Sequence, residues 1–164
     1  MKTKRENVIS VFGVMNVLSE EKTTAKGAYA IAKNKKIAEG EVKAIEEAQK
    51  NVIIPDKFKE YDEKRIKLCE ELADKDKDGN PVKINNGQQF AISPESQEVF
   101  NEKLQSLREE YKEAIEEKDK VEKDFLDLLA EEVEVDFHKV KIDDLPDNVT
   151  ASQIEALDEI IIMS

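Results

Sequence analysis

The sequence predicts a mainly α-helical fold, an elongated antiparallel helical hairpin of coiled-coil character with one or two small β-hairpins. Three observations lead to this fold class. Charged residues make up 39% of the 164 residues, against about 25% in an average globular protein, which is typical of long solvated helices. Only 5 glycines and 4 prolines are present, too few for a loop-rich chain. The third observation is an apolar stripe of helical period in the second half of the chain.

That stripe begins at Phe100 and ends at Leu128, with spacings that alternate between four and three residues. Eight of its nine positions are apolar, and Lys118 is the exception. The positions are Phe100, Leu104, Leu107, Tyr111, Ala114, Lys118, Val121, Phe125 and Leu128. This pattern predicts one helix of roughly 35 residues with a coiled-coil-like seam. The helix expected before it is shorter, so earlier helices, the C-terminal segment or a second copy of the chain must cover the remainder.

Helical spacing also marks the start of the chain. The apolar positions within Val8–Leu18 predict a first helix over residues 6–19, although many β-branched residues leave a strand as the alternative. Thr23 or Thr24 can cap a second helix through residues 25–36.

Glycine and proline divide the chain that follows. We expect Gly40 to bend or interrupt the second helix, after which the apolar pattern resumes at Val42. Pro55 disfavours helix at the preceding residue and predicts a break. A third helix over roughly residues 55–73 then pairs with the long helix, because a turn and a predicted β-hairpin join the two.

Small β elements are expected at two places. The turn Asn85-Asn86-Gly87 separates two short apolar segments and predicts a β-hairpin, because Asn and Gly tolerate positive φ. Ser93-Pro94 then starts the long helix. After Ala130 the period changes to alternation, which predicts one or two short strands around Asp136–Lys139.

The C-terminal segment ends in a short helix. Thr150 and Gln153 form a capping box for that helix. The residues Ile160–Met163 are too apolar for open water, so we expect them to dock within the chain or against another subunit.

We interpret the chain, residues 1–164, as a single elongated domain with three parts, 1–54, 55–130 and 131–164. The net charge is −12, with a balance of +3 in residues 1–54 and −15 in the remainder. A general nucleic-acid coat requires net positive charge, so no direct nucleic-acid partner is expected.

No apolar run is long enough to span a bilayer, so no membrane association is expected. The basic Met1–Arg5 followed by the apolar Val8–Leu18 superficially resembles a signal peptide. Asn16 interrupts that run, and no small-x-small cleavage site follows it. We therefore expect a core-facing helix and a cytoplasmic protein.

No catalytic residue, metal site or cofactor is predicted, and the protein is not expected to be an enzyme. Asp74-x-Asp76-x-Asp78-Gly79 matches the first half of a calcium-binding EF-hand loop, but position twelve is Asn85, where a bidentate carboxylate is required. We favour an acidic turn there. His138 is the only histidine and has no recognisable partner, and Cys69 is the only cysteine, which we expect to be a buried apolar side chain.

The candidate ligand-binding residues lie on the second helix. Lys26, Tyr29 and Lys33 share one side of it, at spacings of three and four. Lysines supply charge for a phosphate, a tyrosine can stack on a base, and Asn34 can hydrogen-bond a polar edge. Together with Lys36, these residues could hold a nucleotide. The same face could instead dock the acidic half of another subunit, or be an ordinary solvated surface.

All of the candidate residues except Lys26 lie in the segment Gly27-Ala28-Tyr29-Ala30-Ile31-Ala32-Lys33-Asn34-Lys35-Lys36-Ile37. An acidic helix, a Lys77-Asp78-Gly79-Asn80-Pro81-Val82 turn, a Phe90-Ala91-Ile92 strand and a second long acidic helix follow. In this order, over roughly Ala25 to Leu129, the chain resembles uncharacterised small acidic helical proteins encoded by phages and prophages of Gram-positive bacteria. The resemblance implies a phage gene product acting in the host cytoplasm or in virion assembly. It carries over no functional residues, because that family has no established activity.

The leading functional hypothesis is a non-enzymatic, homo-oligomeric binding protein of phage type. It would inhibit host defence by sequestering a nucleotide signal or by binding a host defence protein. Two alternatives remain. One is a structural or assembly protein that uses its helices as a scaffold. The other is an acidic DNA mimic that blocks a nucleic-acid-binding protein.

Overall fold

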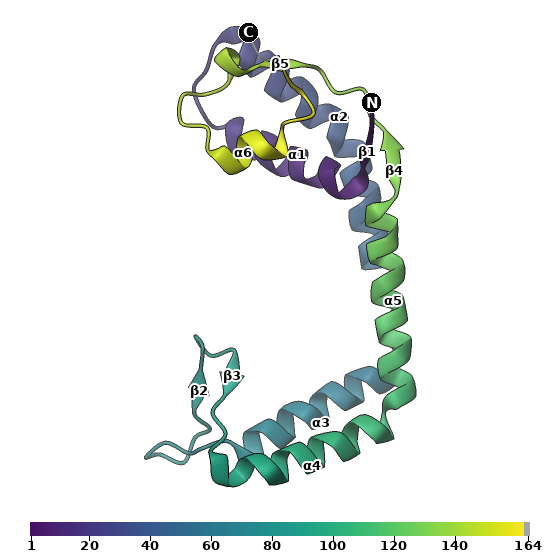
Figure 1. Ribbon diagram of the computed structural model, residues 1–164, viewed down its shortest axis with the longest axis vertical. Helices are drawn as coiled ribbons and strands as arrows, with labels where there is room; N and C mark the ends of the chain where they lie inside the picture. The colour runs from purple at the N-terminus through teal and green to yellow at the C-terminus, as the bar shows by residue number, and fades with distance from the viewer. Residues whose placement is uncertain (163–164) are drawn as a thin grey trace. The chain divides into compact units, whose positions relative to one another are not determined.

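The computed structural model describes residues 1–162, and the chain forms two compact units. Unit 1 joins Met1–Val52 to the chain from Asp124 onward, and unit 2 is Ile53–Lys123. The fold is mainly helical with small two-stranded β elements, which confirms the predicted class at this level (Figure 1). The chain passes between the units after Val52 and after Lys123, near the subdivisions predicted after residues 54 and 130.

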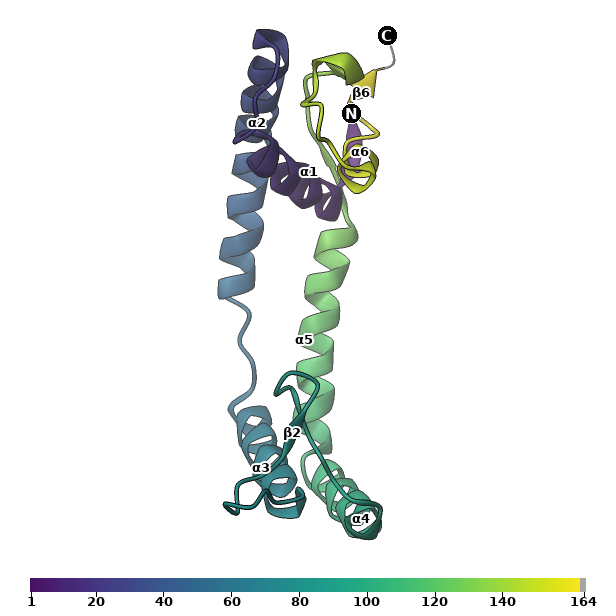
Figure 2. The ribbon, with the colours of Figure 1, turned by 90° about the vertical axis from the view of Figure 1, so that its left-hand side faces the viewer.

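Two helices form the base of unit 1. α1 (Arg5–Leu18) is a helix and not the alternative strand, and it buries Val8, Val11, Met15 and Leu18 on one face. α2 (Ala25–Lys50) starts at the predicted cap and continues through Gly40 without interruption. The two helices pack against each other and cross obliquely (Figure 2).

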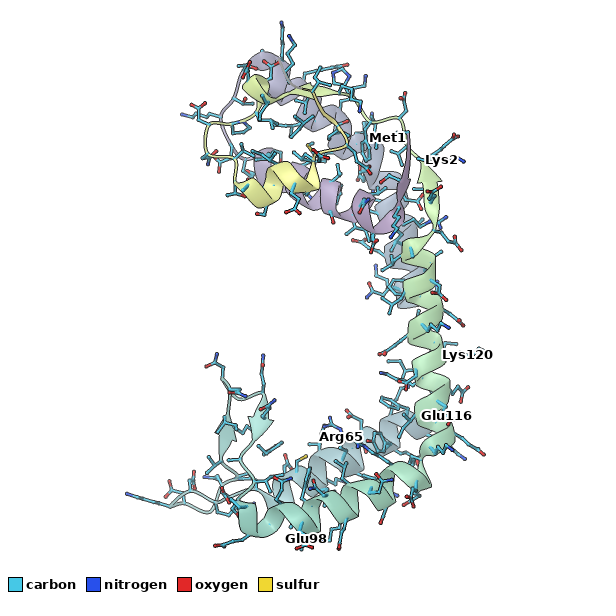
Figure 3. The ribbon with its side chains drawn as sticks, in the orientation of Figure 1. Met1, Lys2, Arg65, Glu98, Glu116 and Lys120 are labelled. Carbon is cyan, nitrogen blue, oxygen red and sulfur yellow. The ribbon has the colours of Figure 1, made fainter. Side chains whose placement is uncertain are left out.

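Two short strand pairs bring the C-terminal part of the chain onto these helices. β1 (Lys2–Lys4) is antiparallel to β4 (Glu132–Glu134), and the Met1 ammonium extends the pairing by donating to the Val135 carbonyl at 2.8 Å (Figure 3). β5 (Val140–Lys141) is parallel to β6 (Ile161–Ile162). The short strands predicted around Asp136–Lys139 are confirmed, because β4 precedes these residues and β5 follows them.

The C-terminal elements close the core of unit 1. A 3₁₀ turn, η1 (Ile142–Asp144), precedes α6 (Ala151–Ala156), which has the predicted Thr150–Gln153 capping box. Leu157 and Ile160 are 0% exposed and pack with residues of α1 and α2. Docking of the apolar end within the chain is thus confirmed at Ile160, whereas Met163 lies outside the described residues.

Arg5 joins three segments of unit 1. Its Nε donates to Glu41 Oε1 of α2 at 2.6 Å, and its Nη1 donates to the Leu128 carbonyl and to the Glu131 carboxylate. Arg5 is itself half-buried, and these acceptors raise the pKa of its guanidinium. Its backbone N–H also donates to the Glu131 carbonyl at 3.1 Å. A single cation thereby fixes the end of α5 beside α1 and α2.

Unit 2 is built on a pair of helices. α3 (Asp56–Leu72) and α4 (Pro94–Glu110) pack side by side in opposite directions (Figure 1). Figure 3 shows Glu98 extending from the side of α4 that faces away from α3. An aromatic series reinforces the unit: the Phe58 and Tyr61 rings lie 5.6 Å apart, and Tyr61 and Tyr111 lie 6.0 Å apart.

The predicted single long helix is wrong, because α4 ends at Glu110 and α5 (Lys112–Ala130) begins after Tyr111. Tyr111 has φ −107° and ψ 18°, outside the helical well, and its ring is buried against Tyr61 under the Lys64 ammonium. Its N–H still donates to the Leu107 carbonyl. The apolar register therefore passes through the break, which is why the sequence pattern did not reveal it. All nine stripe positions are buried or half-buried in one chain.

The predicted β-hairpin is present as β2 (Lys83–Ile84) and β3 (Gln89–Phe90). Asn85, Asn86 and Gly87 have φ of 51°, 56° and 86°, which explains the choice of Asn and Gly there. Among the described residues, none of the helices combines the length and apolar character that crossing a bilayer requires.

Candidate functional site

The start of α2 is fixed by contacts with η1. Thr24 caps the helix by accepting from the Gly27 N–H at 3.0 Å. Thr23 Oγ1 donates to the Asp144 carbonyl at 2.8 Å, and Thr24 Oγ1 donates to Asp144 Oδ1 at 3.0 Å. Gly27 permits this approach, because a Cβ at that position would lie 1.8 Å from the Asp144 carbonyl oxygen. These contacts anchor η1 to the first turn of α2.

About two turns further along α2, Asn34 holds the segment that precedes β5. Its Nδ2 donates to the His138 carbonyl at 2.8 Å, and its Oδ1 accepts from the His138 N–H at 2.7 Å. Asn34 is 0% exposed, so both bonds are shielded from water. We call these two hydrogen bonds the Asn34 clamp. By holding the His138 backbone, the clamp fixes the positions from which the side chains of His138 and Lys139 project.

Between these two anchor points lies a pocket of about 420 Å³ within unit 1. Its walls come from the first turns of α2, from the segment around β5, and from β6. The lining residues are Ala25, Lys26, Tyr29, Ala30, His138, Lys139, Val140, Lys141, Asp144 and Ile162. Figure 1 shows β5 lying along α2 at this place. The volume is within the usual range for small-molecule sites, about 300–1,000 Å³.

An aromatic pair with a nearby cation stands at one end of the pocket. The Tyr29 and His138 rings meet edge to face, with centroids 5.7 Å apart and planes at 88°. Lys33 Nζ lies 3.5 Å from His138 Nδ1 and 5.9 Å from the Tyr29 centroid. Tyr29 is 61% exposed, so its ring is accessible for stacking.

Of the five predicted site residues, only some lie at the pocket. Lys26 and Tyr29 line the pocket, and Lys33 stands beside it. Asn34 lies behind the wall and uses both amide atoms on His138, so it is not available to a ligand while that clamp holds. Lys36 is exposed and outside the lining.

Sequence reasoning missed the opposite wall. His138 was set aside because it is the only histidine, and Lys139, Lys141 and Asp144 were not singled out. One signal was available: Lys139 and Lys141 are the only basic residues after Lys123, in the most acidic part of the chain. In the structure, both lysines line the same pocket as Lys26 at the start of α2.

The other residues that the sequence singled out, the Asp74–Asp78 turn and Cys69, lie in unit 2. Among the described residues, no group of three or more His, Cys, Asp and Glu side chains is placed to hold a metal ion. Asp76 Oδ1 instead accepts from the N–H groups of Asp78 and Asn80, each at 2.9 Å, as an acidic turn would. Cys69 is half-buried, and burial raises the pKa of its thiol, which disfavours a reactive thiolate.

The arrangement as a whole suits binding. The pocket combines three lysines, an accessible phenol ring, an imidazole and one carboxylate, which together match an anionic ligand with a flat ring. Comparison with family models, curated proteins and solved structures finds no match to this chain. The site's own chemistry is therefore the basis for a functional assignment.

Proposed function

We propose that this protein is a non-enzymatic binding protein whose pocket beside the start of α2 takes a nucleotide-class ligand. The observation that carries the proposal is the convergence of Lys26, Lys139 and Lys141 with the accessible Tyr29 ring on one pocket. Lysines from two distant segments supply charge for phosphate groups, and Tyr29 supplies a face for a base.

The charge distribution supports the same ligand class. The chain as a whole carries −12, so polyanions such as DNA are repelled at long range. A small anion reaches the lysines at short range, where the local positive charge dominates because salt screens more distant charges beyond about 8–10 Å. The pocket is thus suited to a small phosphorylated molecule and not to a nucleic-acid strand.

In biological terms, the proposed role is sequestration of a nucleotide signal in the host cytoplasm by a phage-type inhibitor of defence. The resemblance to phage and prophage proteins supports this context, and binding without turnover is sufficient for it. A host protein as the target remains the second form of the same hypothesis.

We also propose that the chain forms a homo-oligomer, in which the stripe of α4 and α5 acts as a coiled-coil-like seam. The support is that seven of the nine stripe positions are only half-buried in a single chain. Light scattering coupled to size-exclusion chromatography tests this, and a monomer at all concentrations would refute it.

Calorimetry tests the binding proposal. The full chain is titrated with ADP, ADP-ribose and cyclic nucleotides, beside the variants Lys26→Gln and Tyr29→Leu. We expect each variant to weaken binding by roughly ten-fold, since a charge-assisted contact or a stacked ring is worth about 1–3 kcal/mol. Lys36→Gln is the matched control on α2, and it should bind as the unmodified chain does because Lys36 lies outside the lining. The proposal fails if no nucleotide binds, or if Lys36→Gln weakens binding as much as Lys26→Gln.

A further inference from the structure

A carboxylate in a pocket suited to phosphate requires an explanation. Asp144 lines the same pocket as Lys26, Lys139 and Lys141. We propose that Asp144 determines ligand class: it selects molecules that present hydroxyl or amino donors beside their phosphates, such as nucleotides with a free ribose, and rejects bare phosphates. This inference rests on the proposed function.

Asp144 is held in place by the fold. The Thr24 hydroxyl donates to its Oδ1 at 3.0 Å, which fixes the rotation of the carboxylate. The Thr23 hydroxyl donates to its backbone carbonyl at 2.8 Å, and Gly27 admits that carbonyl against α2. Contacts to both the side chain and the backbone therefore hold the carboxylate at the pocket wall before any ligand arrives.

One oxygen of that carboxylate is available to a ligand. The hydrogen bond from Thr24 uses Oδ1, and within residues 1–162 no protein donor reaches Oδ2. Within residues 1–162, Asp144 also forms no ion pair with Lys26, Lys139 or Lys141. Positive and negative groups thus stand apart on the pocket walls, which suits a ligand that carries both acceptors and donors.

The discrimination follows from elementary chemistry. An ionised carboxylate only accepts hydrogen bonds, so it repels phosphate oxygens and accepts from hydroxyl or amino groups. A pocket that binds any phosphate gains nothing from such a group. A pocket that must exclude abundant inorganic phosphates gains selectivity, because the carboxylate weakens the binding of bare phosphates and strengthens the binding of ligands with hydroxyl or amino donors.

The test compares ADP with pyrophosphate, which share the diphosphate group and differ in the nucleoside. Calorimetry on the full chain gives both affinities for the unmodified protein and for Asp144→Asn. The amide keeps an oxygen to accept from Thr24, but it removes the charge and places a donor where Oδ2 was. Asp147→Asn is the matched control, an exposed aspartate that follows η1 and lies outside the lining.

We expect the unmodified chain to prefer ADP, and Asp144→Asn to reduce that preference by about ten-fold or more, as the loss of one charged hydrogen bond implies. Pyrophosphate should bind Asp144→Asn more tightly, and Asp147→Asn should change neither affinity. Binding of ADP with the same preference in Asp144→Asn would overturn this inference and leave the proposed function standing. Tighter binding of pyrophosphate than of ADP by the unmodified chain would also overturn it. An absence of binding by both probes, together with no binding of ADP-ribose or cyclic nucleotides, would refute the proposed function itself.

Discussion

The two compact units bury their apolar side chains to very different extents. In unit 1, Met15, Leu18, Leu157 and Ile160 are no more than 1% exposed, and they come from opposite ends of the chain. In unit 2, α4 has no buried residue, and Tyr61 and Leu68 are the buried side chains of α3. In unit 1, segments from both ends of the chain pack together and enclose a core. A pair of helices, as in unit 2, leaves most of its side-chain surface exposed to water. The candidate pocket lies in unit 1, between α2 and the C-terminal segment.

Truncating matched leucines tests that contrast with the largest expected effect. Leu157→Ala removes a side chain that is 0% exposed in unit 1, and we expect it to lower the free energy of unfolding by about 2–5 kcal/mol. Leu104→Ala removes a half-buried leucine of α4, with an expected cost on the order of 1 kcal/mol. Urea denaturation followed by circular dichroism measures both values. Equal costs would show that unit 2 is packed as tightly as unit 1.

The buried clamp in unit 1 provides the next test. Asn34→Ala leaves the N–H and carbonyl of His138 without their partners, at an expected cost of about 2–3 kcal/mol. Asn16→Ala on α1 is the control, because its side chain has no hydrogen bond within the described residues and its loss should cost less than about 0.5 kcal/mol. Thermal unfolding measures stability, and amide exchange at His138 reports the clamp directly. Unchanged exchange at His138 in Asn34→Ala would contradict the assigned role.

Alanine substitutions at two glycines of α2 distinguish the effect of close packing on stability from the effect of helix propensity. Gly27→Ala places a Cβ 1.8 Å from the Asp144 carbonyl oxygen, so η1 must move, at an expected cost of about 1–3 kcal/mol. Gly40→Ala meets nothing within 4 Å and should stabilise the helix by up to about 1 kcal/mol. Melting temperatures should therefore shift in opposite directions. The same sign for both variants would mean that contact with η1 does not constrain Gly27.

The features that could be predicted from the sequence are those that depend on residues close together in the chain. Helices α1, α2, α3 and α6, the Thr24 cap and the Asn85-Asn86-Gly87 turn depend on residues close in sequence, and each was predicted. Lys26 and Tyr29 were found for the same reason, because they share one helix face. The break at Tyr111 was missed because its cause, the contact with Tyr61, is tertiary.

The second wall of the pocket is held against α2 by contacts between residues far apart in the sequence. His138 reaches Asn34 across a separation of 104 residues, and Asp144 reaches Thr24 across 120. β1 escaped notice likewise, since Lys2–Lys4 is a strand only because β4 pairs with it. Helical spacing identifies one side of such a site, and only the packing of unit 1 supplies the other.

The smallest expected effect concerns the acidic turn of unit 2, where Asp76 accepts hydrogen bonds from nearby residues. Hydrogen bonds from the backbone N–H groups of Asn80 and Asp78 lower the pKa of Asp76 below its ordinary value of 3.8. Because the folded pKa is lowered, the stabilisation is present above that ordinary value and is lost as pH falls through the lowered pKa. The Asn80 amide resonance should therefore titrate below pH 3.8 in the unmodified chain.

Two variants of Asp76 show whether that effect stays local. Asp76→Asn keeps an accepting oxygen, so the turn should persist and the low-pH titration of the Asn80 amide should disappear. Asp76→Ala removes the acceptor and should increase amide exchange at Asp78 and Asn80, while α3 and unit 1 remain unchanged. Loss of protection along α3 in Asp76→Ala would show that the turn stabilises the helix pair. Long-range coupling would then stabilise unit 2 as well as unit 1, and the difference between the two units would be smaller than we infer.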